Sequence, residues 1–261
     1  MKNITKINEN LYRLEIPYKD IYTTVYLIKT DEGFLLFDAA SYDEDIDNYI
    51  VPFLNEYNVT GENLKYVFIS HDHIDHSGGL KAFMKKYPNT CIISFNPLLV
   101  ERFKDYDTHL AKENDVVLGS LKIISIIGHT AESGAILDMR TKTLLTGDSL
   151  QLYGIFGSGK WGSNISFPDT HIAEINKLKQ MDINHILTDH DYHPYGYSYL
   201  GKENVENALN ACIESLYKIR DMIINNPELS DEEICAIYNQ QDLPTLGEYI
   251  VTQVRKKLVK N

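Results

Sequence analysis

Apolar and polar residues alternate over the first forty residues of the chain, as they do in strands with one buried face. The alternation predicts strands at residues 11–16, 24–28 and 34–38, and Asp31-Glu32-Gly33 is typical of a hairpin turn between the last two. Further apolar runs predict strands at residues 64–69, 91–93, 116–118, 121–127, 135–137, 143–145 and 183–187. Apolar residues at helical spacing predict helices at residues 43–57, 79–86 and 170–179 and a short helix after Pro97. Strand-rich and helical segments therefore occur twice, which predicts an α/β (α+β) fold in the form of a four-layer αββα sandwich.

The pattern becomes helical near residue 201. Apolar residues at helical spacing predict helices at residues 203–224, 231–238 and 246–259. We therefore expect a domain at residues 1–200 that carries the functional site, and a helical C-terminal extension at residues 201–261 that covers its pocket. The Tyr- and Gly-rich stretch at residues 195–201 is the expected boundary between them.

Metal-binding residue types are concentrated in one short segment after the predicted strand at residues 64–69. Its sequence is Ser70-His71-Asp72-His73-Ile74-Asp75-His76-Ser77-Gly78-Gly79. Imidazole and carboxylate are ligands that zinc and other first-row divalent metals prefer, and burying so many of them without a metal would cost several kcal/mol. The H-x-H-x-D-H spacing on a loop at the carboxyl end of a strand predicts four ligands for two adjacent ions, His71, His73, Asp75 and His76. Asp72 is out of this register, and we expect it to support the site or face solvent.

Three later strands also end in a ligand type next to a small or polar residue. They lead into Gly128-His129-Thr130, Gly147-Asp148 and Asp189-His190. We expect these segments to complete the coordination that the first loop begins. His185 and His193 compete with His190 as the last ligand, and His190 is preferred because it ends its strand.

The order of these motifs resembles that of the metallo-β-lactamase superfamily, over about residues 10–195. The resemblance implies a binuclear metal centre at one edge of the sandwich and points to the glyoxalase II-like or lactonase-like branch. By matching positions, it implies one metal held by His71, His73 and His129, and a second held by Asp75, His76 and His190. It also implies that Asp148 bridges the two ions and that Asp38 supports the site without binding metal.

The chain departs from the family pattern at three of these motifs. Thr130 is followed by Ala131-Glu132-Ser133 instead of Pro-Gly, and His190 lies between two aspartates instead of two glycines. Asp38 is followed by two alanines instead of Thr-Gly. These differences affect the assignment of His190 as a metal ligand most, because the residues on both sides of it differ from the family motif.

Charge and composition narrow the classes of partner. The formal net charge is −12 over 261 residues, which disfavours a nucleic-acid partner because phosphate backbones are bound by many Lys and Arg side chains. No apolar run reaches the roughly 18 residues of a membrane helix, and the N-terminus does not resemble a signal peptide, so we expect a cytoplasmic protein with no membrane partner. The three cysteines are widely spaced and predict reduced thiols. The oligomeric state is left open.

Two other features concern the pocket and the isolated histidines. Residues 154–161 fit a phosphate-binding loop except that Trp161 replaces the Ser or Thr that should contact Mg²⁺, so we do not expect an NTPase. We interpret the segment as a glycine-rich loop at the pocket mouth, with candidate substrate-contacting residues Tyr153, Phe156, Lys160 and Trp161. His109 and His171 are expected to lie at the surface or to have ordinary hydrogen-bond partners.

These features together predict a metal-dependent hydrolase that uses a metal-bridging hydroxide to cleave a small thioester, ester or lactone. Asp75 is expected to orient the nucleophile and Asp148 to hold the metal spacing. The ions are expected to be zinc, with iron or manganese as alternatives. An iron persulfide dioxygenase and a phosphodiesterase of the same superfamily remain alternatives, whereas His73 in place of Glu points away from flavin-linked di-iron oxidoreductases.

Overall fold

In the computed structural model, described for residues 3–156, 162–240 and 245–259, the chain divides into two compact units. Unit 1 comprises Met1–Ser125 and Ile136–Met139, and unit 2 comprises Ile126–Ala135 and Arg140–Asn261. The strand β10 (Gly134–Asp138) has residues in both units.

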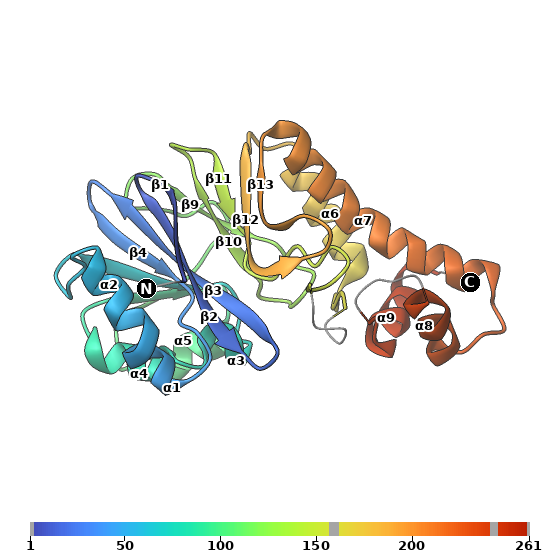
Figure 1. Cartoon of the computed structure of the whole chain (residues 1–261), viewed down its shortest axis with the longest axis horizontal. Helices are drawn as coiled ribbons and strands as arrows, with labels where there is room; N and C mark the ends of the chain where they lie inside the picture. Colours follow the sequence, from blue (N-terminus) through green and yellow to red (C-terminus); the bar gives the residue numbers. More distant parts are fainter. Residues whose placement is uncertain (1–2, 157–161, 241–244, 260–261) are drawn as a thin grey trace. The chain divides into compact units, whose positions relative to one another are not determined.

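The main sheet of unit 1 contains β1 to β7 in the order of the chain (Figure 1). Its strands are β1 (Ile4–Asn8), β2 (Leu11–Tyr18), β3 (Ile21–Thr30), β4 (Gly33–Phe37), β5 (Leu64–Ile69), β6 (Cys91–Ser94) and β7 (Thr108–Leu110). The first four strands pair antiparallel, and Thr30 pairs with Gly33 across the predicted hairpin turn, which is confirmed. From β4 to β7 the pairing is parallel, so the carboxyl ends of β4 and β5 lie at one edge of the sheet. Asp38 and Ser70 follow these two ends directly.

The helices of unit 1 lie in the segments of the chain that connect its parallel strands. They are α1 (Asp43–Asp45), the π-helical turn η1 (Ile46–Ile50), α2 (Val51–Glu56), α3 (Ile74–Ser77), α4 (Leu80–Lys86) and α5 (Pro97–Arg102). The helix predicted at residues 43–57 forms as α1, η1 and α2 in direct succession, and Pro52 lies in the first turn of α2, where a proline is well tolerated. Leu36, Phe53 and Phe83 are among the fully buried residues of this core, and each such side chain contributes about 1.5–3 kcal/mol. Two further strands, β8 (Val116–Val117) and β9 (Leu121–Ser125), pair antiparallel.

Unit 2 contains the neighbouring strands β11 (Thr143–Leu145), β12 (His185–Tyr192) and β13 (Gly196–Leu200). Because β11 and β12 are parallel, their carboxyl ends lie at the same edge, which brings Asp148 and His190 close in space. The helices of this unit are α6 (Pro168–Leu178), α7 (Lys202–Asn225), α8 (Asp231–Asn239) and α9 (Glu248–Leu258). A capping box between Ser230 and Glu233 starts α8. In Figure 1, α8 and α9 lie against the C-terminal half of α7, where buried apolar side chains form a second core.

The structure corrects the sequence expectations for three strands and for part of the ligand segment. Strands β1, β7 and β13 were not predicted, and β13 occupies the stretch expected to be a boundary at residues 195–201. Asp75 and His76 lie in the short helix α3 instead of on a loop. The helices predicted after residue 201 are present, but they belong to the same compact unit as β11–β13, and the division at residue 200 stays a prediction. Within the described residues, no helix combines the length and apolarity needed to cross a bilayer.

Candidate metal centre

The first pair of candidate ligands in unit 1 is His71 and His73. The Nε2 atom of His71 lies 3.0 Å from Nδ1 of His73, and the two rings meet edge to face. His71 is buried, while His73 is exposed. Two imidazole nitrogens directed at each other at this distance are suited to bind the same ion, together with further ligands.

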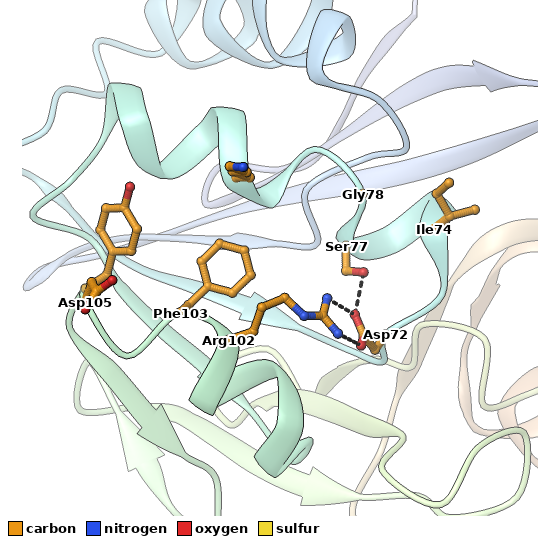
Figure 2. A pocket seen from close by; sticks show the side chains of 9 residues that line it. Asp72, Ile74, Ser77, Gly78, Arg102, Phe103 and Asp105 are labelled. Carbon is orange, nitrogen blue, oxygen red and sulfur yellow. Dashed lines mark hydrogen bonds and ion pairs between the residues drawn. The ribbon is translucent and has the colours of Figure 1, made fainter.

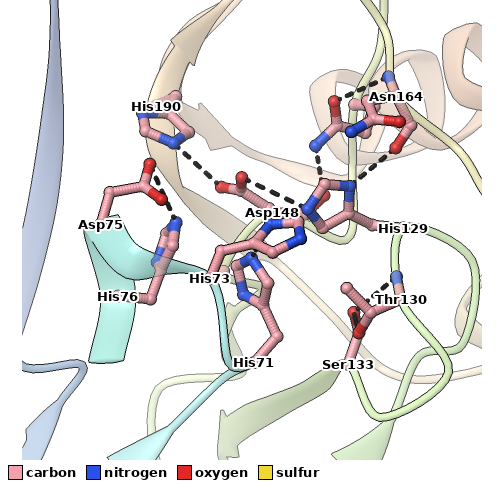
Figure 3. Close-up of polar contacts among 12 residues, drawn as sticks. His71, His73, Asp75, His76, His129, Thr130, Ser133, Asp148, Asn164 and His190 are labelled. Carbon is pink, nitrogen blue, oxygen red and sulfur yellow. Dashed lines mark hydrogen bonds and ion pairs between the residues drawn. The ribbon is translucent and has the colours of Figure 1, made fainter. Parts of the chain in front are cut away.

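The second pair is Asp75 and His76 in α3. The Oδ2 atom of Asp75 lies 3.6 Å from Nε2 of His76, and Figure 3 shows the two side chains directed at each other. The ring of His76 also lies 4.2 Å, centre to centre, from that of His71, so the two pairs are adjacent. The four predicted ligands of the loop therefore form two neighbouring pairs within unit 1.

Asp38 connects the two pairs. Its buried carboxylate accepts hydrogen bonds from the backbone N–H of Ser70 at 2.7 Å, from the Ser70 hydroxyl at 2.7 Å and from Nδ1 of His76 at 2.8 Å. Because an ionised carboxylate only accepts, Nδ1 of His76 carries the proton and Nε2 is left as the metal-binding atom. The Ser70 oxygen lies 3.0 Å from Nδ1 of His71 and fixes that ring in the same way.

The backbone around Asp38 requires an unusual conformation and a close approach. Asp38 has φ 66°, a left-handed conformation that aspartate tolerates better than most residues. At Gly78, a Cβ atom would lie 2.0 Å from the carbonyl oxygen of Ser41, so no side chain fits there. The glycine therefore lets the loop after β4 contact the end of the ligand segment.

Asp72 lies between the two histidines of the first pair but is directed away from them. Its carboxylate accepts two hydrogen bonds from Arg102, at 2.6 and 3.2 Å, and one from the Ser77 hydroxyl at 2.8 Å. Figure 2 shows this group at one side of a pocket of about 650 Å³. Asp72 thus holds the ligand segment to α5, in line with the expectation that it supports the site.

Unit 2 brings together His129, Asp148 and His190. The Oδ2 atom of Asp148 lies 3.7 Å from Nε2 of His129, and Oδ1 lies 3.3 Å from Nε2 of His190. Figure 3 shows Asp148 between the two rings. All three side chains are buried. One carboxylate that presents each oxygen to a different imidazole is the arrangement expected of a ligand shared by two ions.

The orientation of His129 is fixed by the segment before α6. Its Nδ1 atom donates to the carbonyl oxygen of Asn164 at 2.7 Å, which leaves Nε2 directed at Asp148. The carbonyl oxygen of Gly128 accepts from the N–H groups of Ser166 and Phe167, so the same segment also holds the backbone beside His129. No sequence pattern marks Asn164, because its contact with His129 is made by a backbone oxygen 35 residues further along the chain.

His171 differs from the sequence expectation. It is fully buried in α6, and its Nδ1 atom has no hydrogen-bond partner among the described residues. Burial, together with the neighbouring His129, lowers the pKa of His171 to about 3. At Gly128, a Cβ atom would lie 2.2 Å from this Nδ1, so the neutral ring packs directly against the backbone beside His129. His109, by contrast, is exposed and lies 2.8 Å from Asp115, as expected.

The competing histidines have other partners. His185 begins β12 and its Nε2 atom lies 2.7 Å from the Ser198 hydroxyl. His193 stacks on Phe156 with ring centres 3.6 Å apart. Of the candidate pocket residues, Tyr153 is partly buried and its pKa is raised by burial and by Glu214. Lys160 and Trp161 lie outside the described residues.

Comparisons with known proteins agree with this picture. A model of the metallo-beta-lactamase superfamily matches residues 18–94. An uncharacterized Bacillus subtilis protein, YobT, is 27% identical over 188 residues, which cover 63% of this chain and 77% of that protein. Hydroxyacylglutathione hydrolase 1 of Vibrio vulnificus is 29% identical over 154 residues, covering 57% of this chain and 56% of that protein. A solved metallo-beta-lactamase family protein from Thermus thermophilus is similar with a TM-score of 0.67 and 15% identity, over 95% of this chain and 91% of that one.

The family-model match and the similarity to the Vibrio hydrolase support membership of the metallo-β-lactamase superfamily. The family model covers the segment from His71 to His76, and the structural similarity extends over nearly the whole chain. At 15% identity that similarity shows the fold alone, and it confirms the predicted mixed α/β class with its αββα sandwich. The match spans only 56% of the Vibrio hydrolase, so that protein's activity does not transfer on similarity alone.

Proposed function

We propose that the ligand pairs of unit 1 and the Asp148 cluster of unit 2 serve one binuclear metal centre. In this proposal one divalent ion is held by His71, His73 and His129, and the other by Asp75, His76 and His190. Asp148 is shared between them. The support is the order of the motifs in a superfamily member and the separate geometry of each unit.

The arrangement within each unit fits a pair of ions. In unit 1 the ligands form two adjacent pairs, and Asp38 supports both of them. In unit 2 the two oxygens of Asp148 face different histidines. That division of Asp148 is the observation that carries the proposal, because a ligand of a single ion would not need its two oxygens beside different imidazoles. Zinc suits imidazole and carboxylate ligands, and iron and manganese accept them as well.

The proposed reaction is hydrolysis of a small thioester, ester or lactone. Two divalent ions, when bound, supply a hydroxide nucleophile at neutral pH and polarise the carbonyl that is attacked. The chain's own residues fix the geometry for this chemistry. Asp38 and the Asn164 carbonyl set the tautomers of His76 and His129, and in this proposal Asp75 orients the nucleophile.

The similarity to hydroxyacylglutathione hydrolase 1 favours a thioester among these substrates. A hydroxyacylglutathione joins an acyl group to a thiol, so its hydrolysis yields a carboxylate and a free thiol. The net charge of −12 supports a small-molecule substrate over a nucleic acid. Selectivity among small acyl compounds would then depend on residues near Tyr153 and Phe156.

The test is a substrate panel with metal-loaded protein. Protein loaded separately with Zn²⁺, Fe²⁺ and Mn²⁺ is offered a hydroxyacylglutathione, an aliphatic lactone and an aryl phosphodiester. Thiol release from the thioester is followed at a fixed metal content, and Asp31→Asn, an exposed turn variant, serves as the control beside Asp148→Asn. We expect thioester cleavage by the parent and the control and its loss in Asp148→Asn. Oxygen uptake with a persulfide and the iron-loaded protein, without thioester cleavage, would instead establish the dioxygenase.

A further inference from the structure

Gln151 is a buried amide three residues after Asp148, and only 4% of its surface is exposed. Its Nε2 atom donates to the carbonyl oxygen of Asp148 at 2.8 Å and to the hydroxyl oxygen of Tyr192 at 3.1 Å. Its Oε1 atom accepts from the backbone N–H of Asn164 at 3.0 Å. The amide can donate twice, so both of its donor positions are used within unit 2.

Each partner of Gln151 leads to a different candidate ligand. Asp148 is itself one of them. The carbonyl group of Asn164 accepts from Nδ1 of His129 at 2.7 Å. Tyr192 lies two residues after His190 in β12, and the two rings meet edge to face with centres 5.9 Å apart. One side chain therefore connects the backbone of Asp148, the strand that carries His190 and the segment whose carbonyl group holds the His129 ring.

We propose that Gln151 is the positioning residue that sets the relative placement of His129, Asp148 and His190. The proposal rests on the metal centre proposed above, and it assigns Gln151 no contact with metal or substrate. An apolar side chain of similar size would fill the same space but would leave the Asn164 N–H and the Asp148 carbonyl without their partner. Gln151 is thus suited to hold the segments at a fixed spacing, which close packing alone does not define.

Other contacts in unit 2 do not involve Gln151, so replacing its side chain should shift the ligand atoms but leave the fold intact. The N–H groups of Ser166 and Phe167 still donate to the carbonyl oxygen of Gly128, and the parallel pairing of β11 with β12 does not involve Gln151. The fold of unit 2 therefore has independent support. Loss of the amide should be felt mainly in the spacing of the ligand atoms.

The experiment compares Gln151→Met with Gln180→Met, the same substitution at an exposed glutamine of unit 2. Co²⁺ is the probe, because its visible absorption reports coordination geometry. Binding is measured by competition with a chromophoric chelator, and thermal unfolding of the metal-free proteins reports the fold. Gln151→Met should bind Co²⁺ about 10- to 100-fold more weakly, with altered visible absorption, while Gln180→Met matches the parent.

Wild-type Co²⁺ affinity and absorption in folded Gln151→Met would overturn the proposal. Should that variant not fold, Tyr192→Phe decides, because it removes only the hydroxyl partner and keeps the ring. An altered Co²⁺ spectrum in Tyr192→Phe supports the role of Gln151. An unchanged spectrum with unchanged affinity contradicts the placement of His190 through Tyr192, and with it the proposal that Gln151 positions all three ligands. These readouts need no substrate, so a parent protein that binds two ions but cleaves no thioester would refute the proposed reaction alone.

Discussion

Replacing Asp38 by asparagine tests how the protein prepares its candidate ligands. The change keeps the size of the side chain, and asparagine tolerates the left-handed backbone at φ 66° as well as aspartate does, so added strain is not expected. What changes is the hydrogen bonding. The carboxylate accepts three bonds of 2.7 to 2.8 Å, whereas the amide retains one oxygen and places a donor beside the others.

The size of the effect follows from these contacts. If the amide oxygen keeps the Ser70 N–H, its nitrogen faces the Ser70 hydroxyl and Nδ1 of His76. The hydroxyl can rotate to accept, but the ring cannot accept at Nδ1 without moving its proton to Nε2. One charge-assisted bond is then lost and another weakened, which we expect to lower the free energy of unfolding by about 3 kcal/mol. The tautomer change also removes the metal-binding lone pair of His76, so metal affinity should fall about 10- to 100-fold.

Urea unfolding of the metal-free protein measures the first effect, and Co²⁺ titration measures the second. Asp31→Asn makes the same substitution in the exposed hairpin turn and should leave both unchanged. The reasoning would be refuted by an Asp38→Asn protein that is as stable as the parent and retains two ions with parental affinity. A loss of stability with unchanged metal binding would show that the carboxylate supports the fold but not the tautomer of His76.

Four further predictions concern individual side chains. His73→Ala should reduce the bound metal measured by elemental analysis, because one nitrogen of the first pair is lost, and full metal content would contradict that role. Asp148→Asn should weaken both ions, since each oxygen faces a different histidine; normal binding of either ion would count against sharing. Arg102→Met should cost about 1 kcal/mol or less in urea unfolding, because the Arg102 side chain of its ion pair with Asp72 is 55% exposed, and a double-mutant cycle with Asp72→Asn measures the coupling. Burial lowers the pKa of His185 below its ordinary value of 6.5, so the folded state resists protonation and loses stability as the pH falls through that value. In metal-free protein, His185→Gln should therefore lose less stability than the parent between about pH 7 and about pH 5, and equal losses would refute this assignment.

The sequence by itself determined most of the candidate ligands. The H-x-H-x-D-H spacing is local, and four ligand types within six residues are difficult to explain without a metal. An apolar run followed by a small or polar residue and a ligand type is visible in the chain before His129, Asp148 and His190. The expectation that His190 ends its strand is wrong, however, because β12 continues to Tyr192. The helices after residue 201 were also predictable from their periodicity.

Other features depend on residues that meet only in the folded chain. Neither the packing of His171 against Gly128 nor the central place of Gln151 leaves a periodic signal, since each depends on partners far along the sequence. The same is true of the surroundings of His190 and His193, since His193 stacks on Phe156 whereas His190 lies beside Asp148.

The sequence therefore determined which residue types could bind metal, and the tertiary structure decided how they are presented. The physical reason is that ligand chemistry belongs to each side chain, whereas tautomer, burial and spacing are properties of its surroundings. Asp38 shows the difference clearly: its identity is plain in the sequence, but its hydrogen bonds to Ser70 and His76 exist only because β4 and β5 end side by side.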